Sequence, residues 1–257
     1  MSKTTKIVIG VVVAVLVAVT AGPFVYIHFI ESKAPAPLAL STGTPTPAAA
    51  TVAPAGTTVA GATTVDGALT STAAAAGTGD PSTFSADGTW APNASSIVGY
   101  RVKEKLFGQS AEAAGRTSKV TGSMTIAGTT VSKASFTADM TSVKSDQSGR
   151  DDQFQGRIMQ TSKYPTATFE LTSPIELTTI PADKTPLTVK ATGNLTLHGT
   201  TKAVTIDIGA QRNGTTIEVN GSVPIVFADY GVGNPSGGPA TTEDHGVLEF
   251  LIVFAKG

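Results

Sequence analysis

The chain has 257 residues, of which 40% are hydrophobic and only 14% are charged. Its 18 basic and 19 acidic residues leave a net charge of -1, which argues against nucleic-acid binding because phosphate contacts need a surplus of Lys and Arg. The absence of cysteine excludes disulfides, iron–sulfur clusters, thiolate zinc sites and a cysteine nucleophile. The three histidines lie far apart in the sequence, so we expect neither a metal site nor a cofactor.

The N-terminal part predicts a membrane anchor. Residues 7–30 contain no Asp, Glu, Lys or Arg, and 24 residues are enough to cross a hydrocarbon core of roughly 30 Å. Lys3 and Lys6 precede this stretch, so the positive-inside rule predicts a single-pass protein of the cell membrane with a cytoplasmic N-terminus. A signal peptide cleaved after the small residues 19–21 is the alternative, in which case the protein is secreted. Both interpretations place the rest of the chain outside the cytoplasm.

The next part has the composition of a linker. Residues 34–80 hold 15 Ala, 11 Thr and 5 Pro, but only two charged residues and no aromatic residue. Such a segment cannot bury enough apolar area to offset its chain entropy. We therefore divide the chain into an anchor at 1–33, a disordered linker at 34–86 and a folded domain at 87–257. An O-glycosylated stalk and an unmodified spacer both fit the linker.

The folded domain shows apolar residues at every second position, which is typical of strands with one buried face. The segments with this pattern are 98–102, 120–126, 136–140, 167–171, 187–197, 204–210, 217–227 and 247–255. In the last of them we expect Glu249 to point outward and Phe250 and Ile252 to point inward. A helix is expected only between Gly149 and Lys163. The pattern indicates an antiparallel, all-β domain, either a barrel or a sandwich.

Glycines stand within the apolar rows, at Gly193 and Gly221 among other positions. In a barrel, small inward residues leave volume for a ligand. Glycines can also serve as kinks or bulges that bend the strands. Both interpretations remain open at this point. If these glycines leave volume for a ligand, a leucine at Gly193 or Gly221 would displace that ligand at little cost in stability.

Five short motifs follow one another through the domain. They are Gly88-Thr89-Trp90, Arg150-Asp151, Lys163-Tyr164-Pro165, Leu197-His198-Gly199-Thr200 and Asp229-Tyr230-Gly231. Together they resemble the YceI-like lipid/polyisoprenoid-binding family. Gln153, Phe154 and Phe227 depart from the residues common in that family. The resemblance implies an eight-stranded antiparallel, lipocalin-like barrel with one short helical segment. It also implies a cavity for an isoprenoid or another long-chain lipid, commonly in a secreted or periplasmic protein.

The wall of such a cavity needs apolar shape rather than hydrogen-bonding groups. The lipid-binding candidates are the large inward residues Tyr100, Val102, Met124, Phe136, Met140, Phe169, Leu171, Val189, Leu195, Leu197, Val219, Val223, Ile225, Phe227 and Phe250. Taken singly, each of them fits an ordinary core residue better than a ligand contact. The prediction therefore concerns the set rather than any single member.

Catalytic motifs are absent from the sequence. It contains no Gly-x-Ser-x-Gly, no P-loop and no His-Glu-x-x-His. We interpret Arg150, Asp151 and Asp152 as ion-paired or capping residues at a helix start, and His198 as a solvated turn residue. The sequence therefore predicts a membrane-tethered, extracytoplasmic lipid-binding protein rather than an enzyme. A structural or stress-related surface barrel without a ligand is the alternative.

Overall fold

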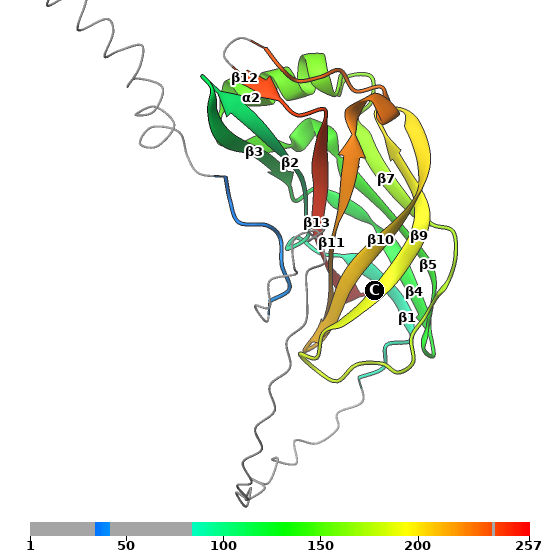
Figure 1. Cartoon of the computed structure of the whole chain (residues 1–257). Coiled ribbons are helices and arrows are strands. Elements are labelled where there is room, and N and C mark those ends of the chain that lie inside the picture. The colour runs from blue at the N-terminus through cyan, green and yellow to red at the C-terminus, as the bar shows by residue number, and fades with distance from the viewer. Residues whose placement is uncertain (1–33, 42–83, 238–239) are drawn as a thin grey trace, which may run out of the picture.

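The structure is a computed structural model that describes residues 34–41, 84–237 and 240–257. Its described residues form one antiparallel sheet of thirteen strands, rolled into a barrel (Figure 1). Eight strands make the closed ring, in the order β1 (Gly88–Pro92), β4 (Val120–Ala127), β5 (Thr130–Asp139), β7 (Thr166–Leu171), β9 (Leu187–Leu197), β10 (Thr200–Asn213), β11 (Thr216–Val226) and β13 (His245–Lys256). The choice between barrel and sandwich is thereby decided.

The ring closes because β13 has two partners on the same edge. Its C-terminal end pairs with β1, where Trp90 lies opposite Lys256. Its N-terminal half pairs with β2 (Ile97–Leu106), where Val247 lies opposite Arg101. Between β1 and β2 the chain turns, and the hydroxyl of Ser96, which is fully buried, accepts a hydrogen bond from the Val253 amide at 3.1 Å.

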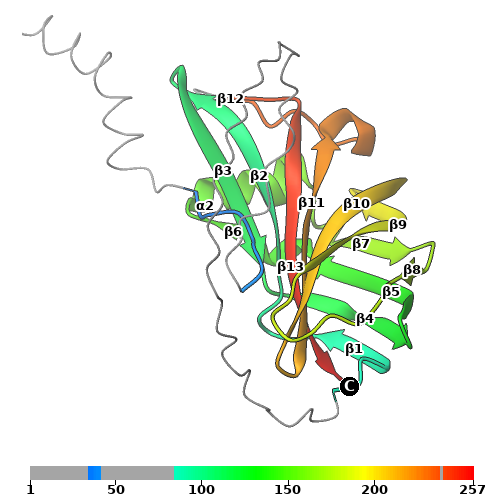
Figure 2. The ribbon, with the colours of Figure 1, turned by 60° about the horizontal axis from the view of Figure 1, so that its bottom comes forward.

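Beyond the ring, β2 pairs with β3 (Gln109–Thr117), and β3 pairs with β6 (Lys144–Ser145). The helix α2 (Ser148–Gln153) lies beside this hairpin and continues into a π-helical turn at Phe154–Ile158 (Figure 2). The remaining short elements are β8 (Ile175–Glu176), β12 (Ala240–Thr242) and the 3-10 turns η2 (Met140–Ser142) and η4 (Phe227–Tyr230). The helical segment and η4 thus lie at one end of the barrel.

Each of the eight predicted segments falls largely on a strand, and the helix lies within one residue of its predicted range. Two longer strands were not predicted, β1 and β3. β3 has the sequence QSAEAAGRT, in which three alanines and a glycine hide the difference between its two faces. A strand shows in a sequence chiefly through the alternation of large apolar and polar side chains, and β3 lacks this alternation.

The structure describes parts of the predicted linker, whereas the predicted anchor lies outside the described residues. Residues 34–41 do not behave as a featureless tether, because they lie against the outside of the barrel, drawn in blue in Figures 1 and 2. Phe84 and Ala86, also assigned to the linker, pack against or within the core. The predicted span at 7–30 lies outside the described residues, and the described part of the chain contains no helix long and apolar enough to cross a membrane.

Candidate functional site

The barrel encloses an apolar cavity of about 170 Å³, more than ten times the roughly 10–15 Å³ that one water molecule needs. Among the described residues that line it, only Thr168, Gln211 and Arg212 are polar. The predicted wall residues found here are Met124, Phe136, Phe169, Leu171, Val189, Leu195, Val219, Val223 and Phe250. Such a cavity can hold an apolar group but offers few hydrogen bonds to a polar one.

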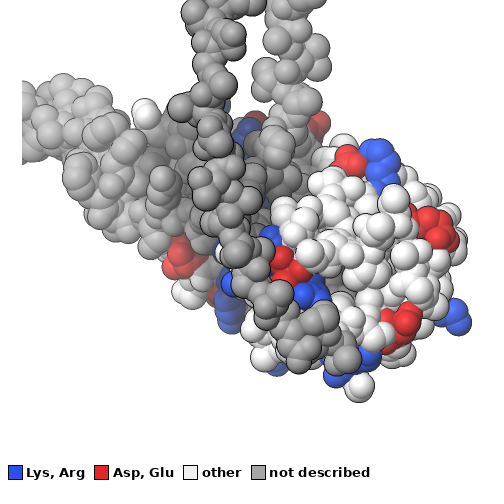
Figure 3. Space-filling view, turned by 90° about the horizontal axis from the view of Figure 1, so that it is seen from below, with Lys and Arg blue, Asp and Glu red and all other residues white. Residues whose placement is uncertain are grey.

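Loop residues at one end of the barrel also line this cavity, and they were not predicted. They include Phe84, Leu177, Ile180 and Pro181. The guanidinium of Arg212 lies 4.5 Å from the centre of the Phe84 ring and pairs with Asp183 at 3.4 Å. Loops have no fixed period, so no pattern in the sequence marks these residues. In the described surface seen from this side, Lys and Arg are interspersed with Asp and Glu (Figure 3).

A second cavity of about 320 Å³ lies at the helical end of the barrel. The remaining predicted wall residues line it, namely Tyr100, Val102, Met140, Leu197, Ile225 and Phe227. The helical segment contributes Phe154, Ile158 and Met159. Val98 and Leu248 line both cavities and therefore stand between them. All fifteen predicted wall residues thus line one cavity or the other, while their role in holding a lipid stays a prediction.

The second cavity has a polar side that includes Arg150, Glu104 and Tyr100. Arg150 forms ion pairs with Asp146 and, at 3.6 Å, with Glu104. Burial alone would lower the pKa of Arg150, but Asp146 and Glu104 raise it above its ordinary value. The Tyr100 ring stacks on Phe154 with centroids 4.9 Å apart, and burial raises the pKa of Tyr100 to about 12. This side therefore combines an arginine that is ion-paired with two acidic residues and a phenol that is protonated at neutral pH.

The surroundings of Gly193 and Gly221 contradict the expectation that a leucine at either position would cost little stability. A Cβ atom at Gly193 would lie 2.4 Å from both the Glu170 carbonyl oxygen and the Phe169 ring. One at Gly221 would lie 2.7 Å from the Phe250 ring. Both glycines do face inward, but an aromatic ring from the neighbouring strand already fills the space above each of them. The cavities lie beside these rings, so a leucine at either glycine would clash rather than displace a ligand.

His198 also differs from its interpretation as a solvated turn residue. It is only 9% exposed, its Nδ1 lies 3.2 Å from the Tyr230 carbonyl oxygen, and its ring packs 4.4 Å from that of Tyr164. The ion-pair interpretation is confirmed for Asp151, which lies in the first turn of α2 and pairs with Lys144 at 3.4 Å. Asp151 also accepts hydrogen bonds from the Ser145 amide at 2.7 Å and hydroxyl at 2.8 Å. Within the described ranges, no three His, Asp or Glu side chains are grouped so that they could hold a metal ion.

The sequence profile of the YceI-like domain matches residues 89–254. The chain belongs to the YceI-like family. Among solved structures it is similar to a polyisoprenoid binding domain from Saccharophagus degradans, with 18% identity and a TM-score of 0.54 over 66% of this chain and 98% of that one. The protein BcnA of Burkholderia cenocepacia is 24% identical, with a TM-score of 0.48 over 62% of this chain and 95% of that one.

A YceI protein of Campylobacter jejuni is 17% identical, with a TM-score of 0.43 over 56% of this chain and 84% of that one. No curated protein sequence matched the chain. The similarity to the Saccharophagus domain supports the YceI-like barrel fold. The YceI-like barrel fold, together with the two cavities of this chain, supports the binding of apolar ligands in general.

Proposed function

We propose that this YceI-like protein binds a lipid with a long apolar tail, an isoprenoid or a similar molecule, inside its barrel. The observation that carries the proposal is the cavity of about 170 Å³ whose wall is almost entirely apolar. An isoprenoid tail has no hydrogen-bonding groups, so such a wall suits it. The structure similar to this chain from Saccharophagus degradans is described as a polyisoprenoid binding domain, which supports the same ligand class.

The binding energy comes from the area removed from water. Burying apolar surface contributes roughly 25 cal/mol per Å², so about 300 Å² of tail would contribute about 7.5 kcal/mol before ordering costs. A tail that passes between Val98 and Leu248 would reach both cavities. Its polar end would then lie at the helical end of the barrel, where Arg150 and Tyr100 can donate hydrogen bonds to oxygen atoms.

The proposal includes a location. Residues 7–30 are the membrane anchor in this scheme, with Lys3 and Lys6 in the cytoplasm and the barrel outside. The lipid site would then face the extracytoplasmic side of the membrane that anchors it. A C-terminal tag removed by protease added to intact cells supports this topology. A tag that survives in intact cells but is degraded in lysed cells overturns it.

Ligand binding is tested by extracting the purified full chain with organic solvent and identifying lipids by mass spectrometry. The variant Ala134→Leu adds volume to the first cavity, because Ala134 lines it from β5. The matched control is Ser135→Gln, at the next, exposed position of the same strand. We expect co-purified lipid with the parent and with S135Q, and about tenfold less with A134L, which corresponds to about 1.4 kcal/mol of binding energy.

The barrel must stay folded for this comparison to decide the matter. The melting temperature of delipidated A134L should therefore lie near that of the delipidated parent, because the added side chain enters empty space. If the parent carries no lipid and A134L melts well below it, the interior is filled. The protein would then be a structural barrel without a ligand, as the aromatic rings packed over Gly193 and Gly221 would allow.

A further inference from the structure

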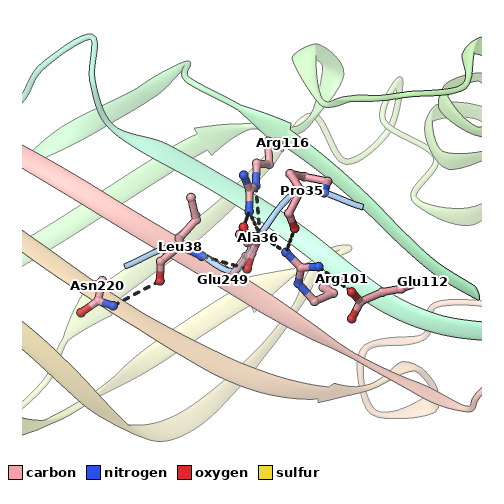
Figure 4. A network of polar contacts seen from close by, with 8 residues as sticks. All are labelled: Pro35, Ala36, Leu38, Arg101, Glu112, Arg116, Asn220 and Glu249. Atoms are coloured by element: carbon pink, nitrogen blue, oxygen red, sulfur yellow. Dashed lines mark hydrogen bonds and ion pairs between the residues drawn. The ribbon is translucent and has the colours of Figure 1, made fainter. Parts of the chain in front are cut away.

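The outer face of the barrel carries charged and amide side chains that water does not reach. Glu218 and Asn220 of β11 and Glu249 of β13 occupy outward positions, yet they are 4%, 3% and 4% exposed. Outward side chains of a small barrel normally face solvent, since the core lies on the other side of the sheet. Residues 34–41 lie across this face and contact all three side chains. Figure 4 shows the contacts of Leu38 with Asn220 and Glu249.

The first half of the segment offers carbonyl groups to two arginines. The guanidinium of Arg101, on β2, donates to the Pro35 carbonyl oxygen at 2.6 Å. The guanidinium of Arg116, on β3, donates to the Ala36 carbonyl oxygen. Proline has no backbone N–H, so Pro35 and Pro37 bring no donor to a surface occupied by cations. Carbonyl acceptors and arginine donors therefore match along this half.

The second half offers amide groups to two carboxylates. The Leu38 amide donates to Glu249 at 3.4 Å, and its carbonyl oxygen accepts from the side-chain amide of Asn220 at 3.3 Å. The Ser41 amide donates to Glu218 at 2.9 Å, and the Ser41 hydroxyl also bonds to that carboxylate. Arginine donors on the barrel thus face the carbonyl groups in the first half of the segment. Carboxylate acceptors face the amide groups in its second half.

The barrel holds these side chains in place by bonds of its own. Arg116 donates to Glu249 from Nε at 3.0 Å and from Nη2 at 2.8 Å. Gln211 and Asn213 each donate to Glu218 at 2.9 Å. Because these partners lie on β3 and β10 rather than in the segment, the barrel itself supplies hydrogen bonds that position both carboxylates. Such a preformed arrangement lowers the ordering cost of binding a peptide.

Apolar contact adds to the polar matches. Leu38 and Leu40 are partly buried and are two of the three leucines in residues 34–83. Leu40 lies above Gly209 on β10, where its Cδ1 would be 3.5 Å from a Cβ atom. A Cβ atom there would also come within 2.5 Å of the Asn220 amide oxygen, so Gly209 makes room for the side chain that binds Leu38.

We propose that the outer face formed by β2, β3, β11 and β13 is a binding site for residues 34–41 of the same chain, and that its occupation holds Ala34 at the barrel wall. On the proposed function, in which 7–30 spans the membrane, only residues 31–33 then separate the span from the docked segment. Three residues reach about 10 Å, whereas a flexible chain of the 53 residues from 31 to 83 would span about 40 Å. Docking thus keeps the lipid site close to the membrane surface.

The docking itself is tested by distances between two spin labels in the full chain. The chain lacks cysteine, so Ala36→Cys and Lys133→Cys introduce two unique labelling sites, both exposed. We expect one narrow distance distribution. Adding Leu38→Asp with Leu40→Asp removes the two partly buried apolar side chains of the segment and brings two carboxylates to a face that carries Glu218 and Glu249, and it should broaden the distribution. The control Leu69→Asp makes one such change outside the docked segment and should leave the distribution narrow.

A broad distribution in the parent, equal to that of the double aspartate variant, overturns the proposal. A narrow distribution that disappears when labelled protein is diluted with excess unlabelled protein overturns the same-chain assignment, because the segment then comes from a second copy. Lipid extracted from the same preparations reports on the proposed function separately. If the double aspartate variant retains lipid while the parent shows no docking, the further inference fails and the proposed function stands.

Discussion

The ring of Phe169 occupies the space that a side chain at residue 193 would need. A Cβ atom at Gly193 would lie 2.4 Å from Phe169 Cζ and equally close to the Glu170 carbonyl oxygen. The ring can move only at the expense of its neighbours, and the carbonyl belongs to the β7–β9 pairing. Tyr100 covers Gly115 in the same way, with 2.5 Å between Cε1 and the missing Cβ. Glycine and aromatic ring thus form one packing unit across two strands.

Gly193→Ala should therefore destabilise the barrel, although it adds a single methyl group. Overpacking a well-filled core typically costs about 1–3 kcal/mol. Denaturant unfolding of the full chain, followed by far-UV circular dichroism, measures the difference. The control is Gly149→Ala in α2, where a Cβ atom would meet nothing within 4 Å. Equal stability of the parent and G193A would show that Phe169 does not fill this site.

Tyr100→Phe should change how stability depends on alkaline pH. The folded-state pKa of Tyr100 is raised to about 12 from 10.0, chiefly by burial. The resulting stability is fully present below pH 10 and is lost as the pH rises towards 12, because only the unfolded state readily ionises the phenol. Unfolding free energies measured from pH 8 to 12 should therefore fall less steeply in Y100F than in the parent. Parallel curves would place Tyr100 in contact with water.

Acid should release the docked segment at its C-terminal end. Hydrogen bonds from Asn213, Ser41 and Gln211 hold the pKa of Glu218 below its ordinary value of 4.5, even though burial opposes them. A lowered pKa gives a contribution that is present above pH 4.5 and is lost as the pH falls through the folded-state value. Hydrogen exchange at the Ser41 amide should accelerate, relative to its intrinsic rate, as the pH falls below the folded-state pKa of Glu218.

Glu218→Gln is the control for this titration. A glutamine keeps an acceptor oxygen for the Ser41 amide but cannot titrate. Glu249, Arg101 and Arg116 are the other charged groups that bind the segment on this face, and they are unchanged in the variant. Protection of Ser41 in E218Q should not change with pH in this range. If E218Q loses protection at the same pH as the parent, another group releases the segment.

Trp90 should report the integrity of the barrel end that contains Phe84. It is the only tryptophan of the chain, is 1% exposed, and donates from Nε1 to the Ala86 carbonyl oxygen at 2.7 Å. Its fluorescence should be blue-shifted and protected from acrylamide in the folded protein. Trp90→Ala should cost about 3–5 kcal/mol, as for large core truncations, in thermal or denaturant unfolding. Trp90→Phe should cost less because most of the ring contact remains.

Local patterns in the sequence determined the strands and their buried faces. Alternation along 187–197 and 217–227 marks one face as apolar because successive side chains of a strand point to opposite sides. The same rule correctly predicted that Glu249 points outward and Phe250 points inward. It also selected fifteen residues that all line the two cavities. These properties depend only on residue type and on the geometry of an isolated strand.

Contacts between distant residues decided the rest. The alternation of β13 does not reveal that it pairs with both β1 and β2, and so closes the barrel. Nor does the sequence pattern show that Phe169 lies over Gly193. It also does not show that Pro35 and Leu38 cover Arg101 and Glu249. Period and composition report which face of a segment avoids water, but they carry no information about what that face meets. That is why an outward glutamate could be predicted from the sequence, and its burial beneath a segment more than 200 residues away could not.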